Sequence, residues 1–239
     1  MSSFPGGLAV AAGLAVAGWF IGQGFIEGRA SDRIVTVKGL AERDVDADLA
    51  VWRLPFVATS YDLARAQRDI TSAHDTVMAF LLEGGLSQSA ISIQVQTVED
   101  RQANAYQSGN TSNRFIVKRV LLVRTTKVDT VQNLSQKTGE LVEKGVVLGA
   151  DRGPEALQPT YSFTGLNDIK TEMISEATKK GIVAAEQFAR DAGAELGRLM
   201  GARQGVFQIL ARDQAPQLRE AQQRKKTVRV VSTFRFELL

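Results

Sequence analysis

The stretch GLNDIKTEMISEATKKGIVAAEQFARDAGAELGRLMGARQG, residues 165–205, holds the longest periodic apolar pattern beyond the N-terminal segment. Its apolar residues recur three, four or seven to eight positions apart, so a helix would place them on one stripe. They are Leu166, Ile169, Met173, Ala177, Ala184, Phe188 and Ala192. Asn167 is a suitable N-cap, Asp168 adds a negative charge in the first turn, and Gly193 can end the helix in a left-handed conformation. We expect the main core helix here, and none of its residues carries chemistry.

The composition indicates a folded protein. At 239 residues, with 44% hydrophobic and 23% charged residues, the chain is long enough for one sizeable core or two small ones. Its 29 basic and 26 acidic residues leave a formal net charge of +3, which does not indicate the clustered basic surface that nucleic acid requires. The lack of cysteine excludes disulfides, thiolate metal sites and cysteine nucleophiles, but it does not fix the compartment.

The N-terminal segment predicts a membrane anchor. Residues 1–26 contain no charged side chain, and the apolar run at residues 8–26 approaches the ~20 residues that a helix needs to cross a bilayer. A cleaved signal peptide, with Gly28 and Ala30 at the cleavage positions, is the alternative; it is less favoured because no Lys or Arg precedes the run. Export of the remaining chain is the expected arrangement.

Small residues spaced four apart within this segment allow two membrane helices to approach closely. The pairs are Gly13 with Ala17 and Gly18 with Gly22. They predict self-association in the membrane, although glycine and alanine are also simply common in membrane helices.

The remaining chain predicts a mixed fold. Strands are expected at residues 34–38, 47–58, 91–98, 115–126, 159–163, 205–211 and 227–238, and further helices at 61–83 and 128–143. We expect a turn or bulge at Gly39, an edge or bulge at Pro55 and a helix cap at Ser60. From residue 47 onward, the order strand, helix, strand, strand, helix, short strand is the split β-α-β pattern of a ferredoxin-like layer. The last strand has one core face, with Val228, Val230, Ser232, Phe234, Phe236 and Leu238.

Two polar hairpin tips, at residues 99–113 and 211–224, are candidate contact sites. Tyr106 lies in the first tip. In and beside the second, the basic residues Arg219, Arg224, Lys225 and Lys226 are able to touch anionic lipid or an acidic partner, but a solvated loop explains them better.

The sequence contains no recognisable catalytic set. The one histidine, His74, falls on the apolar side of its helix and has no neighbours at metal-ligand spacing, so we expect it to be packed. No phosphate-binding glycine loop occurs. Asp44, Asp46 and Asp48 alternate, which suits a solvated edge better than a weak calcium site or a face for a basic partner. We therefore expect no cofactor, no metal and no catalytic residue.

Four blocks resemble the SIMPL domain family, and in particular its bacterial envelope members with an N-terminal anchor. They are VKGLAERDVDADLAVWRLPF (37–56), LNDIKTEMISEATKKGIVAAEQFARDAGAELG (166–197), QGVFQI (204–209) and KKTVRVVSTFRFELL (225–239). The resemblance implies an α+β fold of order β-β-α-β-β-α-β-α-β-β, an extracytoplasmic location and a tendency to oligomerise. It also implies loosely defined roles in envelope integrity or oxidative-stress tolerance, and it carries over no catalytic motif.

Together these observations predict an anchor and linker at residues 1–30 and a SIMPL domain at 31–239, itself divided into 31–163 and 164–239. The expected function is that of a non-enzymatic, homo-oligomeric scaffold on the bacterial inner membrane, with most of the chain in the periplasm and no nucleic-acid partner. A ligand- or peptide-binding module with a pocket at Trp52, Phe56 and Tyr61 is the alternative. An enzyme that uses carboxylates alone is the third hypothesis.

Overall fold

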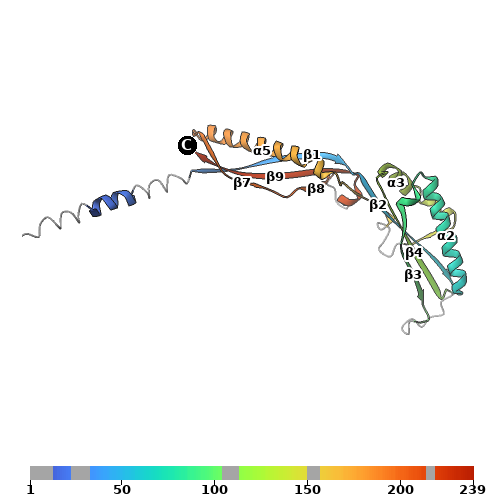
Figure 1. Ribbon diagram of the computed structural model, residues 1–239. Helices are drawn as coiled ribbons and strands as arrows, with labels where there is room; N and C mark the ends of the chain where they lie inside the picture. Colours follow the sequence, from blue (N-terminus) through green and yellow to red (C-terminus); the bar gives the residue numbers. More distant parts are fainter. Residues whose placement is uncertain (1–12, 23–32, 104–112, 150–156, 214–218) are drawn as a thin grey trace, which may run out of the picture. The chain divides into compact units, whose positions relative to one another are not determined.

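The computed structural model describes residues 13–22, 33–103, 113–149, 157–213 and 219–239 (Figure 1). They belong to two compact units, and each unit is described by itself. The first unit comprises Met1–Arg43, Ile169–Gln208 and Arg229–Leu239, and the second comprises Asp44–Asp168 and Ile209–Val228. Helices accompany two separate sheets with antiparallel pairing, so the prediction of an α+β fold is confirmed.

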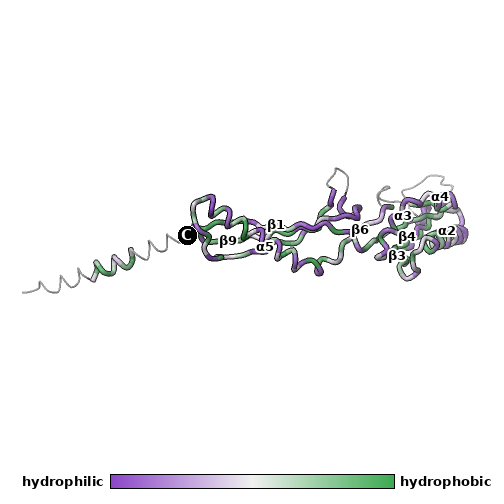
Figure 2. The backbone as a smooth tube through the Cα atoms, turned by 90° about the horizontal axis from the view of Figure 1, so that it is seen from above, coloured by the Kyte–Doolittle hydropathy of each residue, from purple (hydrophilic) through white to green (hydrophobic). Residues whose placement is uncertain are grey.

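Residues 13–22 are helical and mostly exposed. Along them Figure 2 shows hydrophobic residues interrupted by residues of intermediate hydropathy. Among the helices of the described ranges, none combines the length and the apolar character needed to cross a membrane. The predicted span at residues 8–26 includes residues 8–12 and 23–26, which lie outside the described ranges.

The first sheet is built around β9 (Lys225–Leu238). Strands β1 (Ile34–Asp46), β9 and β7 (Leu196–Gln204) lie in the order β1-β9-β7, and β8 (Gln208–Ala211) also pairs with β9. The predicted alternation along β9 is confirmed, because every second residue from Val228 to Phe236 is buried. Strand β7 is missing from the sequence prediction, since its residues, LGRLMGARQ, include two glycines and no regular alternation.

Helix α5 (Leu166–Asp191) lies along this sheet (Figure 1). It ends as predicted, because Gly193 follows it with a φ of 67°. The predicted cap is wrong: the helix begins at Leu166, so Asn167 lies inside it. Asp48 takes over the capping role from a distance in sequence, because its carboxylate accepts hydrogen bonds from the backbone N–H groups of Thr164 and Gly165 at 2.8 to 3.0 Å.

The buried stripe of α5 differs from the predicted one. It runs along every fourth residue and consists mainly of small residues, namely Met173, Ala177, Gly181, Ala185 and Ala189. Phe188, predicted to face the core, is 52% exposed. Among the described residues, the cluster of buried apolar side chains in the second unit is larger than the one beneath α5, so α5 is not the main core helix.

The close approach of α5 to the sheet explains why the residues of its buried stripe are small. A Cβ on Gly39 of β1 would overlap the carbonyl oxygen of Ala177, and one on Gly181 would meet the Phe234 ring at 2.5 Å. The helix backbone therefore lies directly on the sheet, which leaves no room for a large side chain. Strand β1 passes through Gly39 without turning, so the predicted turn at this glycine is wrong.

The second unit contains a sheet of order β3-β4-β2-β5, with β6 also paired to β2. Its strands are β2 (Leu49–Ser60), β3 (Ile91–Asp100), β4 (Phe115–Thr125), β5 (Val147–Leu148) and β6 (Thr160–Ser162), and its helices are α2 (Leu63–Glu83), α3 (Val128–Ser135) and α4 (Gly139–Glu143). Strand β4 lies between β2 and β3, so the unit β2-α2-β3 is a split β-α-β unit. The core residues of β2, including Trp52, Leu54 and Phe56, are buried as predicted.

Three local predictions are wrong in this unit: they concern one helix, one helix cap and the position of Pro55. The expected single helix at 128–143 is divided into α3 and α4. At the break, the Ser135 hydroxyl donates to the Gln132 carbonyl and the Thr138 hydroxyl donates to the Ser135 carbonyl, and Gly139 follows. Asp62, not Ser60, caps α2, because its Oδ1 accepts the N–H of Arg65 at 2.7 Å.

Pro55 lies in the interior strand β2, although an edge or a bulge was expected. Its carbonyl accepts the N–H of Gly149 at 3.0 Å, so its nitrogen faces the β5 side of the strand. There the ladder pairs only Phe56 and Val57, and no donor is needed at Pro55.

A Gly39→Ala substitution tests the close approach of α5. We expect it to lower the free energy of unfolding by about 3 kcal/mol, because the added methyl forces the helix off β1. Gly201→Ala in β7 is the matched control, since a Cβ there meets no atom within 4 Å, and it should change stability by less than about 1 kcal/mol. Urea unfolding measures both, and equal stabilities would contradict the packing.

Candidate functional site

Strand β3 forms an exposed end of the second sheet, which we call the β3 edge (Ile91–Asp100). Ile93, Val95 and Val98 are 54%, 42% and 51% exposed. The register shifts between Ile93 and Val95, so Gln94 is a bulge. The run ISIQVQTV, residues 91–98, contains no charged residue, which is unusual for an exposed edge.

Beside the β3 edge, Arg119 of β4 is 93% buried, at 7% exposure, and bonds to a neutral partner. Its Nε and Nη2 donate to Oε1 of Gln96 at 3.1 and 2.8 Å. Burial lowers the pKa of His74 on α2 below its ordinary value of 6.5, and the positive charge of Arg119 lowers it further, while Asp75 opposes this. The Nδ1 atom of His74 is buried without a partner, so the histidine is packed, as expected.

A polar pocket of about 620 Å³ lies elsewhere in the second unit. It is formed by α3, by β6 and the residues before it, and by the segment that leads into β9. Five glutamines line it, namely Gln132, Gln136, Gln158, Gln222 and Gln223, together with the charged residues Asp46, Asp213, Arg224 and Lys225. Ser135, Pro159 and Tyr161 complete the walls.

Local hydrogen bonds hold these walls in place. The side-chain amide of Gln223 donates to the Asp213 carbonyl at 2.7 Å and accepts the Asp213 N–H at 3.2 Å, which clamps the base of the hairpin. Arg224 donates to the side chains of Gln132 and Asp129 on α3. Burial raises the pKa of Tyr161, while the charge of Arg224 and a hydrogen bond with Ser135 counteract that shift.

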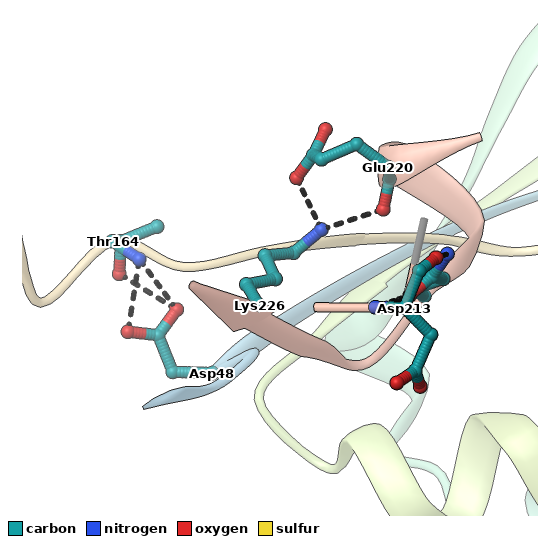
Figure 3. A network of polar contacts seen from close by, with 6 residues as sticks. Asp48, Thr164, Asp213, Glu220 and Lys226 are labelled. Atoms are coloured by element: carbon teal, nitrogen blue, oxygen red, sulfur yellow. Dashed lines mark hydrogen bonds and ion pairs between the residues drawn. The ribbon is translucent and has the colours of Figure 1, made fainter. Parts of the chain in front are cut away.

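Lys226 lies next to the pocket wall in sequence and is fully buried, with 0% exposure. Its Nζ donates to the carbonyl oxygen of Glu220 at 2.9 Å and to the carboxylate of the same residue (Figure 3). We expected a solvated lysine here. The alternation of β9 provides the missed signal, because Lys226 continues the buried series that starts at Val228.

The basic residues of the second tip are mostly engaged within the protein. Arg224 is paired with Asp129, Arg219 also has a partner, and the exposed Lys225 lies in the pocket wall. The expectation of a solvated loop is therefore wrong for Arg224 and Lys226. Tyr106 lies outside the described residues.

The small residues predicted to mediate membrane contact lie in the described helix at residues 13–22. Ala17 is exposed, and a Cβ on Gly13, Gly18 or Gly22 would meet no atom within 4 Å. Contact through these four residues remains a prediction.

The three aspartates predicted to share a solvated edge have separate roles. Asp48 caps the start of α5, as described above (Figure 3). Asp44 accepts a hydrogen bond from the Thr227 hydroxyl at 2.7 Å, and Asp46 lines the polar pocket. Within the described ranges, no three His, Asp or Glu side chains are placed to hold a metal ion.

The predicted aromatic pocket is closed. Trp52 and Phe56 are buried in the core, and the indole Nε1 of Trp52 donates to the Leu157 carbonyl at 2.7 Å. Tyr61 is exposed, so the three aromatic residues do not line one cavity. Asp46 and Asp213 both line the polar pocket, and Asp213 is ion-paired with Arg212 at 3.5 Å, so the enzyme hypothesis remains a prediction.

Protonation of His74 should destabilise the fold. Its pKa is lower in the folded chain than in the unfolded chain, so the unfolded chain binds the proton first as the pH falls below 6.5. Urea unfolding at pH 7.5 and 5.0 should show lower stability at pH 5.0, and His74→Gln should reduce that difference. An unchanged pH dependence in the variant would show that the histidine is not perturbed.

The Lys226–Glu220 pair allows a two-sided test. Glu220→Ala leaves a buried ammonium without its carboxylate and should cost about 2 kcal/mol, somewhat less than a fully buried pair because the Glu220 side chain is 40% exposed. Lys226→Met removes the charge and retains the apolar volume, so its cost should be smaller. Thermal unfolding compares the two, and a larger loss for Lys226→Met would contradict this account.

Comparison with known proteins identifies the family. No curated protein matches the chain. The sequence model of the SIMPL family, described as "Protein of unknown function (DUF541)", matches residues 35–236, which include the whole of the second unit. This agrees with the resemblance of the four sequence blocks. The chain therefore belongs to the SIMPL family.

Proposed function

We propose that this SIMPL-family chain is a non-enzymatic scaffold protein of the bacterial cell envelope, and that its folded part assembles into homo-oligomers through the β3 edge. The single observation that carries the proposal is the exposed edge strand β3, whose residues 91–98 are uncharged and include three exposed apolar side chains.

An edge strand presents backbone N–H and C=O groups that another strand is able to pair with. Soluble proteins usually protect such edges with lysine, proline or a covering loop. Residues 91–98 contain neither lysine nor proline, and the bulge at Gln94 is the one protective feature in this run. Pairing with a second β3 would satisfy the backbone groups and bury Ile93, Val95 and Val98.

Identical edges that pair in antiparallel fashion are related by a twofold axis, so the smallest closed product is a dimer. Larger assemblies need a second contact. The small-residue pairs at Gly13, Ala17, Gly18 and Gly22 would supply it if the N-terminal segment crosses the membrane. This arrangement also agrees with the exposed apolar side chains of Leu14, Trp19, Phe20 and Ile21.

The proposed location is the bacterial inner membrane, with one N-terminal span and the folded part in the periplasm. Support comes from the uncharged N-terminal 26 residues and from membership of the SIMPL family. A link to envelope stress tolerance is part of the same proposal.

The double substitution Ile93→Lys, Val98→Lys tests assembly through the β3 edge. Both side chains are already exposed, so the fold should persist, while like charges on paired edges should repel. We expect the mass of the full-length protein in mild detergent, measured by light scattering after gel filtration, to fall to a smaller species.

Val142→Lys, on the exposed face of α4, is the matched control and should leave the mass unchanged. A strictly monomeric wild-type protein would refute the scaffold proposal. A double variant with the wild-type mass would exclude β3 as the contact.

A further inference from the structure

We propose that the polar pocket is a recognition site for an uncharged carbohydrate. The inference is independent of the scaffold function, since no residue of the pocket belongs to the β3 edge. It depends on which polar groups of the pocket already make hydrogen bonds within the protein and which remain available to a ligand.

Several groups that build the pocket are held by internal hydrogen bonds, although the Nε atom of Arg224 is buried without a partner. The Gln223 amide is held by the backbone of Asp213, and Arg224 is held by Asp129 and Gln132. These contacts fix the walls before any ligand arrives. Preformed walls lower the ordering cost of binding.

A second set of polar groups remains available. Across the described part of the chain, the side chains of Gln136, Gln158, Gln222, Asp46 and Lys225 make no hydrogen bond and no ion pair, although all five line the same pocket. They come from four separate segments of the chain. Each glutamine offers two N–H donors and one carbonyl acceptor, so the set supplies both donors and acceptors.

The charge of the pocket favours an uncharged ligand. Asp213 is paired with Arg212 and Arg224 with Asp129, which leaves Asp46 and Lys225 as one negative and one positive charge in the pocket wall. A phosphate or another anion would require an excess of available cations. Only Lys225 is available, and Asp46 lines the same pocket.

An apolar ligand fits poorly as well. The aromatic side chain in the wall, Tyr161, is 5% exposed. Pro159 is also buried. The wall therefore presents little aromatic surface to a peptide side chain, whereas a sugar presents closely spaced hydroxyls that both donate and accept. The volume of about 620 Å³ accommodates a ligand of a few sugar rings.

Calorimetry on the full-length protein in mild detergent tests the proposal with three uncharged trisaccharides: cellotriose, maltotriose and triacetylchitotriose. We expect at least one of them to bind with a Kd of about 1 mM or tighter. The double variant Gln136→Met, Gln158→Met retains side-chain length and removes both amides, so it should weaken binding at least about tenfold.

Gln88→Met, an exposed glutamine outside the pocket, is the matched control and should bind like the wild type. Asp46→Asn provides a second variant of unchanged shape, and circular dichroism verifies that each variant is folded. The absence of binding by all three sugars would overturn the proposal. So would wild-type affinity in the double variant, or binding of an uncharged tetrapeptide in place of the sugars.

The β3 variant Ile93→Lys, Val98→Lys separates this inference from the scaffold proposal. It should retain sugar binding whether or not it changes the oligomer. Loss of sugar binding in that variant would contradict the independence of the two sites.

Discussion

The first unit depends on the direct contact between the backbone of α5 and that of β1. Gly39 and Gly181 remove two side chains at the closest points, and Ala177 provides the carbonyl that Gly39 approaches. Dispersion falls steeply with distance, so backbones in direct contact gain attraction without a bulky core. This explains how a helix whose buried stripe is mostly alanine and glycine is nevertheless held on the sheet.

Local patterns in the sequence predicted much of the fold. The alternation along β9, the core face of β2 and the end of α5 at Gly193 follow from rules that involve neighbouring residues only. The predictions at Phe188 and Gly39 were wrong because contacts between α5 and the sheet, whose residues are distant in sequence, decide which residues are buried there. The cap of α5 was missed for the same reason, since Asp48 lies 116 residues before Thr164.

The two candidate sites were predictable to different degrees. The hydrophobic alternation of residues 91–98 was visible, but only the sheet order shows that β3 has one neighbour among the described strands and remains exposed. The polar pocket gave no local signal, because glutamines at residues 136, 158 and 222 are far apart in sequence and unremarkable individually. Lys226 was partly predictable. Its burial follows from the alternation along β9, but its charge suggested a solvated loop.

The first unit is discontinuous in sequence, and this constrains how it forms during synthesis. Strand β1 begins at Ile34, whereas its neighbour β9 begins at Lys225. All strands of the second sheet, β2 to β6, have been made by Ser162. A growing chain is therefore able to complete the second sheet before β9 has been made, whereas the first sheet closes only after the chain extends past Lys225.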